Sequence, residues 1–494
     1  MVFSTRFAAV VGSFLAVTPL VLGDICKDFE AAGRNVNKPL SLEFEKEQNN
    51  YWSTACAALR PSCMLSPNST QEVADIVAAL QQTHDQFAVK SGGHMPNPNF
   101  ASIADGILIS TRNLNQIVYD PETTSVVVGP GLQWDQILDG LEGTGRTVVG
   151  GRMGDVGVGG YLLGGGLSFL SAEYGWGANN VINFEVVLAN ATIVNANATS
   201  NAELYEVLKG GGNNFGIVTA FTLQTHPMET DVWGGNYVFG PEQSEDLLKA
   251  VRDFTEYNTD DKAAIILTLE RGAALNLWIM FLFYDGIEPP AGVFDNFTHI
   301  GPSIDNTKTR SYTDLCKANN GFILVGQRYV IATETIPLPN KENGDMVIKS
   351  IWDYWNSIAD TVMDVPGVIA TIAFQPMPRA ITGKAKAMGG DMMDFEPDHD
   401  YIILELDFSY FFPASDNLVD AATQNLYNGI RNIVTEHAEA GRVPDIHRPL
   451  FMNDLYHRQD YWQRMRTADK ARAVAKAVDP EGFWQKRTSG GFRL

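Results

Sequence analysis

The sequence predicts an α+β protein with two large parts. One is a glycine-rich half in which short strands alternate with helices, and the other is a broad antiparallel sheet covered by helices. The chain has 494 residues, more than three times the ~150 residues of one domain. Hydrophobic residues make up 45% of it and charged residues 19%, which is typical of folded proteins and excludes wholesale disorder. The pattern of apolar residues changes near residue 229, where we place the boundary.

The first part, from about residue 58 to 228, is predicted from alternating periodicities. Ser69–Glu72 has the pattern of a capping box, and apolar residues follow it at helical spacing. Two apolar runs separated by Asp120-Pro121 predict a hairpin. The predicted elements are, in order, a helix over 69–80, a strand over 87–89, a hairpin over 117–128 and a helix over 134–141.

The second part, 229–446, has longer apolar runs separated by amphipathic segments. This pattern of apolar and amphipathic segments predicts a broad, antiparallel sheet with helices on one face. The predicted strands are 264–269, 275–284, 368–374 and 401–412, and the predicted helices are 245–254, 346–363 and 418–438. A last helix over 470–478 ends at the turn Asp479-Pro480.

The charge balance excludes one class of partner. With 36 Lys and Arg against 58 Asp and Glu, the formal net charge is −22. An acidic surface repels phosphate backbones, and the sequence has no basic patch, so we expect no nucleic-acid partner.

Residues 1–23 resemble a secretory signal peptide, with Arg6 before an apolar stretch that ends near Gly23. No later apolar run is long enough to cross a bilayer. We therefore expect a secreted protein, or one of the secretory pathway, without a membrane partner after cleavage. Sequons at Asn68, Asn190, Asn197 and Asn296 agree with a glycoprotein.

Four cysteines, Cys26, Cys56, Cys63 and Cys316, follow the signal segment. An even number in a secretory context permits two disulfides in three possible pairings, and free thiols remain an alternative. Because no C-x-x-C occurs, we predict no metal site.

Glycine is concentrated where a phosphate ligand could approach the backbone. The densest cluster is GGRMGDVGVGGYLLGGG at 150–166, and GGGNNFG follows at 210–216. Glycine lets backbone amides come close to a ligand, and runs of such amides suit a pyrophosphate. None of the G-x-G pairs has the third glycine of a Rossmann fingerprint, and no Walker A loop is present. The glycines alone indicate a dinucleotide or phosphate ligand on another fold.

Five motifs in order resemble the FAD-binding module of the vanillyl-alcohol oxidase/PCMH superfamily. They are VKSGGH (89–94), VGPGLQW (128–134), GDVGVGGYLLGGGLS (154–168), YGWGANNV (174–181) and LKGGGNNFGIVT (208–219). The tail from Pro449 resembles the C-terminal element of berberine-bridge-enzyme-like oxidases, in their fungal secreted branch. The resemblance covers roughly residues 50–494. It implies an N-terminal segment 24–57, a PCMH-type FAD domain of two α/β subdomains at 58–228, a substrate domain at 229–446, and a C-terminal element at 447–494 that returns to the FAD domain.

The resemblance also implies a set of cofactor-binding residues. His94 would carry the flavin covalently, and Asn453 would lie beside the isoalloxazine ring. The implied cofactor-binding residues are Lys90, Ser91, Gly92, Gly93, His94, Gly154, Asp155, Val156, Gly157, Gly159, Gly160, Gly164, Ile217, Val218 and Asn453.

The chain departs from the family pattern at three positions. Doubly tethered members have a cysteine shortly before G-V-G-G, whereas this chain has Arg152-Met153-Gly154-Asp155, which implies one tether only. Asn179 replaces the Asp of an A-A-D-N pattern and removes a charge near the cofactor. Phe451 stands where some relatives have a tyrosine base, so that role cannot be transferred.

The catalytic base is therefore sought near Asn453. Asp454 and Tyr456 are the candidates that we select, because both are close in sequence to Asn453. For Asp454, a carboxylate near an apolar flavin face would have a raised pKa that suits a base near neutral pH. Tyr329, Tyr410 and His457 are weaker candidates, and Gln375 is a candidate for polar contact with the substrate.

The function that the resemblance implies is an FAD-dependent oxidoreductase, acting as an oxidase. A small organic molecule of secondary metabolism would pass a hydride to flavin N5, and dioxygen would then reoxidise the flavin. Two alternatives stay open: a carbohydrate oxidase on the same fold, and a flavoprotein that templates a cyclisation without net redox. The partners expected are the small substrate and dioxygen, and the protein is expected to be a monomer.

Overall fold

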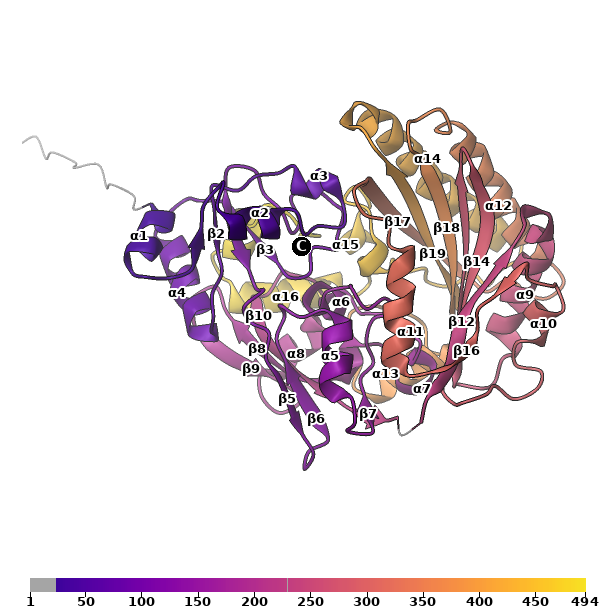
Figure 1. Ribbon diagram of the computed structural model, residues 1–494, viewed down its shortest axis with the longest axis horizontal. Helices are drawn as coiled ribbons and strands as arrows, with labels where there is room; N and C mark the ends of the chain where they lie inside the picture. The colour runs from indigo at the N-terminus through magenta and orange to yellow at the C-terminus, as the bar shows by residue number, and fades with distance from the viewer. Residues whose placement is uncertain (1–23, 229) are drawn as a thin grey trace, which may run out of the picture.

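The computed structural model describes residues 24–228 and 230–494, so the predicted signal segment lies outside the described residues. Two halves lie side by side (Figure 1). The half at left in the figure contains the glycine-rich segments, and the half at right is a large sheet backed by helices. The C-terminal residues return to the first half. The α+β class predicted from the sequence is confirmed.

The first sheet of the glycine-rich half brings the N-terminal segment together with the strand before the S-G-G-H motif. Its order is β1 (Val36–Asn37), β2 (Cys63–Leu65), β4 (Ile107–Ser110) and β3 (Phe87–Lys90), and the last three strands run parallel. The predicted helix is confirmed as α4 (Thr70–Gln81), where the Ser69 hydroxyl accepts a hydrogen bond from the Glu72 backbone N–H.

The second sheet is antiparallel and contains the predicted hairpin. Its order is β5 (Ile117–Asp120), β6 (Ser125–Val128), β10 (Ile217–Gln224), β8 (Val181–Val187) and β9 (Ile193–Ala196). Helix α5 (Trp134–Leu141) packs its apolar side chains into the same core, as the helical periodicity predicts.

The large sheet of the second half has eight antiparallel strands. Its order is β15 (Ile304–Asp305), β12 (Val232–Phe239), β14 (Leu275–Tyr284), β13 (Ala263–Gly272), β18 (Ile369–Met377), β19 (Tyr401–Tyr410) and β17 (Arg328–Pro337), with β16 (Lys308–Arg310) also paired to β12. Four of these strands match the predicted ones, whereas β12, β15, β16 and β17 were not predicted.

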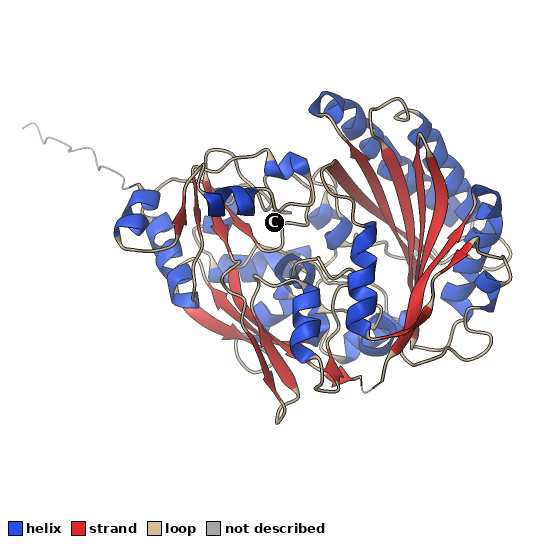
Figure 2. Cartoon of the chain, in the orientation of Figure 1, coloured by secondary structure: helices blue, strands red, loops and turns tan. Residues whose placement is uncertain are grey.

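Helices cover one face of the large sheet (Figure 2). They are α9 (Ser244–Tyr257), α12 (Gly344–Asp360) and α14 (Asp416–Glu439), all three as predicted. Because side chains alternate along a strand, Leu267 and Leu269 of β13 pack under these helices, whereas Thr268 and Glu270 face the first half. One face of the sheet is therefore buried against helices, and its other face is available to line a site.

The remaining elements are short and mostly connect the sheets. They are helices α1 (Ile25–Ala31), α2 (Leu42–Gln48), α3 (Thr54–Ala57), α6 (Val158–Leu163), α7 (Ser171–Tyr174), α8 (Ala202–Leu208), α10 (Asp295–Thr298), α11 (Tyr312–Asn319), α13 (Arg379–Ala387), α15 (Tyr461–Arg464), α16 (Ala468–Val478) and α17 (Phe483–Arg487), and the strand pair β7 (Arg146–Thr147) and β11 (His226–Pro227).

The two terminal segments both complete the first half. A disulfide joins Cys26 to Cys63 in β2, and Cys56 and Cys316 are free and buried. At the other end, Phe483 and Trp484 pack against Phe87, and the Ser489 backbone N–H donates to the Phe87 carbonyl at 2.8 Å.

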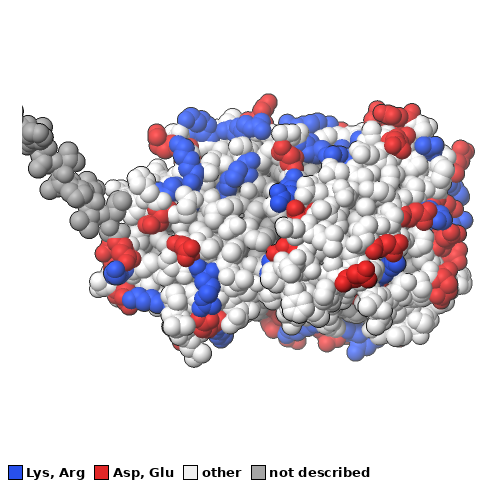
Figure 3. Space-filling model, turned by 90° about the horizontal axis from the view of Figure 1, so that it is seen from above, with Lys and Arg blue, Asp and Glu red and all other residues white. Residues whose placement is uncertain are grey.

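The surface is charged on both halves, and Asp and Glu gather at the end formed by the helices of the large sheet, at right in Figure 3. Within the described ranges, no helix combines the length and the apolar character that crossing a bilayer requires.

A buried ion pair fixes the end of β3. The Lys90 ammonium is fully buried and donates to the Glu47 carboxylate at 2.8 Å and to its carbonyl at 3.0 Å. Ser110 and Arg112 also contact the Glu47 carboxylate. Burial lowers the pKa of Lys90, and the Glu47 carboxylate offsets only part of this effect, so the ammonium depends on Glu47 to keep its charge.

We expect Glu47→Gln to reduce the free energy of unfolding by about 3–5 kcal/mol, because it leaves the Lys90 charge buried without a counter-ion. Urea unfolding followed by tryptophan fluorescence measures the change. Glu45→Gln, two residues earlier in the same helix, breaks an exposed ion pair with Arg60; it is the control and should change stability far less. Equal effects of the two substitutions would contradict the role of the buried pair.

Candidate functional site

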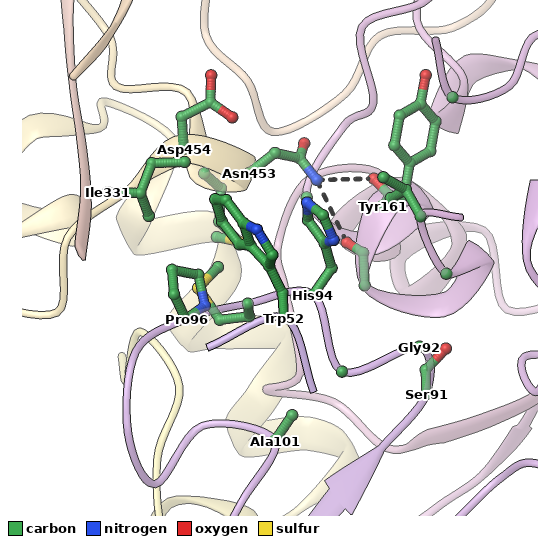
Figure 4. A pocket seen from close by; sticks show the side chains of 18 of the residues that line it. Trp52, Ser91, Gly92, His94, Pro96, Ala101, Tyr161, Ile331, Asn453 and Asp454 are labelled. Atoms are coloured by element: carbon green, nitrogen blue, oxygen red, sulfur yellow. Dashed lines mark hydrogen bonds between the residues drawn. The ribbon is translucent and has the colours of Figure 1, made fainter. Parts of the chain in front are cut away.

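A cavity of about 420 Å³ lies between the two halves, within the range of small-molecule and cofactor sites. The glycine loops of the first half form one wall, and the free face of the large sheet forms another. Residues 451–454 of the C-terminal segment lie between them. Figure 4 shows how side chains from these three sources meet.

Two glycine loops touch backbone to backbone on the first wall. A Cβ atom on Gly92 would lie 2.5 Å from the Gly157 Cα atom, and one on Gly157 would lie 2.4 Å from the Gly92 Cα atom. Ser91 holds the contact together, because its hydroxyl donates to the Pro130 carbonyl at 2.5 Å and accepts from the Gly159 N–H at 3.2 Å. Side chains at these glycines would push the loops apart, so the sequence clusters at 89–94 and 154–160 have a direct steric reason.

Most of the predicted cofactor residues line this cavity. They are Ser91, Gly92, Gly93, His94, Val156, Gly157, Gly159, Gly160, Gly164, Ile217, Val218 and Asn453, and the predicted base Asp454 lines it too. Their roles toward a cofactor stay predictions.

Four predicted residues lie elsewhere. Lys90 is turned away toward Glu47, and Gly154 bonds to the Cys316 carbonyl through its N–H. Asp155 is exposed, and its N–H donates to Asn320. Tyr456 packs in the core under the sheet helices and donates its hydroxyl to Asp420 at 2.6 Å, so the structure does not bring this candidate base to the cavity.

His94 belongs to a stack of three rings that crosses the cavity between the halves. Its imidazole lies parallel to the Trp52 indole at 4.4 Å between ring centroids, and Trp52 stacks on Tyr329 of β17 at 4.2 Å. Burial lowers the pKa of His94 to about 4. The imidazole is therefore neutral at neutral pH and has a ring nitrogen available as a nucleophile or hydrogen-bond acceptor.

Asn453 ties the C-terminal segment to the glycine wall. Its side-chain NH₂ donates to the Tyr161 carbonyl at 3.2 Å and to the Gly160 carbonyl at 3.5 Å (Figure 4). Its side-chain oxygen accepts from the Gly166 N–H at 3.0 Å. Gly164 leaves room for this side chain, since a Cβ there would lie 2.7 Å from the Asn453 amide nitrogen.

Carboxyl groups gather on the opposite wall. Asp454 accepts a hydrogen bond from the Gln375 amide at 2.8 Å, and the Arg152 guanidinium donates to the oxygen of the same amide. Burial first, and then the nearby Glu405 carboxyl, raise the pKa of Asp454 well above its ordinary value. Glu270, Glu405 and Asp407 of the large sheet also line the cavity.

The sequence did not reveal Trp52, Arg152 or the three sheet carboxyls as site residues. A signal for two of them was present: Glu405 and Asp407 stand two apart in the otherwise apolar run of β19, which places both on one face. Of the weaker candidates, Tyr329 lines the cavity, whereas Tyr410 donates to Asp416. Asn179 also lies outside the lining and donates to Asp391.

The first wall fits a dinucleotide such as FAD. Its loops present backbone at positions where a Cβ would collide with the neighbouring loop, and apolar side chains such as Val156, Ile217 and Val218 continue the surface. Such a surface can accept phosphates through amides and a flat ring through apolar contact. Among the described residues, no three His, Cys, Asp or Glu side chains are grouped to hold a metal ion.

Comparisons with known proteins agree with this assignment. Residues 61–197 match the family described as FAD binding domain. The chain is 50% identical over 474 residues to an uncharacterized FAD-linked oxidoreductase of Arthroderma benhamiae, covering 95% of this chain and 94% of that one. It is 31% identical to the FAD-dependent monooxygenase prx3 of Penicillium roqueforti, with 92% and 90% covered.

Among solved structures, BBE-like 1 of Physcomitrella patens superposes with a TM-score of 0.74 at 17% identity, covering 92% of this chain and 97% of that chain. This likeness shows the fold, which is that of the berberine-bridge-enzyme-like proteins. The chain therefore belongs to the FAD-linked oxidoreductase family, as its ordered glycine motifs predicted.

Proposed function

We propose that this protein is a secreted oxidase that oxidises a small, largely apolar organic molecule of secondary metabolism, with FAD attached covalently through His94 and dioxygen as the final electron acceptor. The observation that carries the proposal is the cavity with two unlike walls. One wall is backbone-rich and suits a dinucleotide, and the other is a sheet face with apolar and carboxyl side chains that suits a substrate.

Bound FAD supplies a two-electron acceptor that dioxygen can reoxidise. The residues of this chain would position the cofactor and the substrate and would supply the base. The glycine loops at 91–94 and 156–160 would hold the diphosphate, while Asn453 fixes residues 451–454 against the same wall. The single attachment point is supported by the neutral, buried state of His94 and by the absence of a cysteine in the stretch 152–155.

Asp454 is the group that we assign to proton removal. Its Oδ2 atom is held by Gln375, and its Oδ1 atom makes no hydrogen bond with the described residues, so Oδ1 is available to a substrate hydroxyl or amine. As the substrate heteroatom loses its proton to Oδ1, the adjacent carbon gives up two electrons and its hydrogen to the acceptor. The raised pKa of the carboxyl makes it a stronger base than an exposed aspartate.

Two observations support the secretory compartment and the use of dioxygen. The Cys26–Cys63 disulfide is typical of proteins that fold in an oxidising environment. The relative prx3 is named a monooxygenase, a class of enzyme that uses dioxygen.

Anaerobic mixing with candidate substrates tests the proposed function. A substrate should bleach the yellow absorbance of the purified protein, and admitting ¹⁸O₂ should restore it, with peroxide formed and no label in the product. Label in the product would make the protein a monooxygenase. Product formation without any bleaching would support a cyclisation that needs no net oxidation.

We expect the yellow colour of the wild-type protein to stay with the acid-precipitated pellet, because a bond to His94 survives denaturation. His94→Ala should release its flavin into the supernatant or contain none. His299→Ala, at an exposed histidine of the large-sheet half, is the control and should behave as wild type. Release of flavin from the wild-type protein by acid would show that the tether is wrong.

We expect Asp454→Asn to slow flavin reduction by about 10²-fold or more, the usual scale for loss of a general base, while flavin content stays unchanged. Stopped-flow absorbance measures the rate. Because the base must be ionised, the wild-type rate should rise with pH through the raised pKa of this carboxyl, and the variant should lose that rise. Asp246→Asn, at an exposed position on α9 behind the large sheet, is the control. Reduction at wild-type speed in Asp454→Asn would rule out this base.

A further inference from the structure

The sheet wall of the cavity contains more acidic groups than the proposed proton transfer needs. Four carboxyl side chains line the cavity: Glu270, Glu405, Asp407 and Asp454. Among the described residues that line it, Arg152 is the only lysine or arginine. One base needs one carboxyl, so the other three require a separate explanation.

The register of the large sheet places the acidic groups on one face, in one row and its neighbour. Glu270 of β13 is paired with Thr371 of β18, and Thr371 is paired with Asp407 of β19. Neighbouring strands lie about 4.8 Å apart, so Glu270 and Asp407 flank Thr371 in one row across the sheet. Glu405 lies on the same face two residues before Asp407. The fold therefore builds one acidic patch, which we define as Glu270, Glu405 and Asp407.

Asp407 is the most deeply buried member of the patch, and its carboxyl lies within hydrogen-bond reach of the Glu405 carboxyl when one of the two is protonated. It is 9% exposed, and when neither is protonated its Oδ1 atom is buried without a hydrogen-bond partner. A buried carboxylate oxygen without a donor is costly. Because Asp407 lines the cavity, a donor that enters the cavity can supply the missing bond.

The charge around Asp407 is also unbalanced. Burial raises the pKa of Asp407 well above its ordinary value, and the carboxyls of Glu405, Asp454 and Glu270 raise it further. Arg152 lowers the pKa values of Glu405 and Asp454, whereas burial and the neighbouring carboxyls are the largest influences on Asp407. A positive charge in the cavity would offset this repulsion.

The surroundings of the patch suit the apolar part of such a ligand. Ile331 and Ile369 line the cavity beside the patch. Tyr329 also lines the cavity, and it lies in the next row of the sheet, where it is paired with Ser409. Apolar and aromatic surfaces bind the hydrocarbon body of an organic cation, and an aromatic face also attracts the charge itself.

We propose that the cavity selects an organic cation, a largely apolar molecule with a protonated or quaternary nitrogen, and that Asp407 and Glu270 hold this nitrogen. The inference deepens the proposed function, because it takes the cavity to be the substrate site. A neutral alcohol or sugar that donates its hydroxyls to the same carboxyls is the competing ligand, and the test below separates the two.

The flavin-loaded protein is titrated by calorimetry, without oxygen, with benzylamine and with benzyl alcohol. These probes have the same shape, but only the amine is charged at pH 7.5. We expect benzylamine to bind at least ten times more tightly than benzyl alcohol. Titration in two buffers of different ionisation enthalpy should show proton release with the amine and none with the alcohol, because a cation lowers the pKa values of carboxyls that are protonated beforehand. Equal binding, tighter binding of the alcohol, or binding of neither probe at millimolar concentration would overturn the proposal.

Substitutions test whether Asp407 and Glu270 cause the preference for the amine. Asp407→Asn and Glu270→Gln should each reduce the preference for the amine, and the pair together should abolish it. Asp246→Asn, at an exposed position on α9 behind the sheet, is the matched control and should keep the preference. A preference that survives in a folded Asp407→Asn, Glu270→Gln protein would refute the assignment to these residues.

The outcome is independent of the flavin assignment. A yellow protein that does not prefer the amine overturns only this inference. A colourless protein that binds the amine with the expected preference overturns the flavin proposal but leaves the acidic patch as a cation site. Flavin content from visible absorbance and binding from calorimetry are separate measurements, so the two failures are distinguishable.

Discussion

The contact between the backbones of Gly92 and Gly157 is the constraint on which the site depends. A Cβ on either residue would lie within 2.5 Å of the other Cα atom. The loop after β3 and the loop before α6 can meet only because neither has a side chain at this point. Ser91 then locks the pair to Pro130 and Gly159, and the buried Lys90–Glu47 pair fixes the strand that enters the first loop. The shape of the cavity wall follows from these few contacts.

The two halves are held in register by contacts of different kinds on the two sides of the cavity. On one side, the rings of His94, Trp52 and Tyr329 stack from the glycine wall to β17. On the other side, Asn453 bonds to the glycine wall while its neighbour Asp454 bonds to Gln375 of β18. The polar side chains that we assign to chemistry therefore lie at junctions between the halves, where a shift of either half would change their positions.

Much of the fold could be predicted from the sequence because its signals are local. The N-cap signal at Ser69, the periodic apolar residues of α9, α12 and α14, and the apolar strands of the large sheet each specify one element without knowledge of the rest. The glycine clusters likewise located one wall of the cavity. Lys90 and Tyr456 lie away from the cavity lining, and the sequence could not show this because their positions depend on distant partners: Glu47 precedes Lys90 by 43 residues, and Asp420 precedes Tyr456 by 36. The acidic patch was missed because strand register, and not the sequence of any one strand, places Glu270 and Asp407 in one row on either side of Thr371.

The cavity is lined by residues that range from Trp52 to Phe492, so it lies where the most distant parts of the chain meet. Contacts of such long sequence separation cost loop-closure entropy before they stabilise the fold. A ligand that needs the finished cavity binds the native state and not its precursors, and it shifts the folding equilibrium by mass action. The supply of cofactor during biosynthesis is therefore expected to set the yield of folded protein as well as its activity, so that a cell short of flavin would accumulate less of the protein rather than an empty form of it.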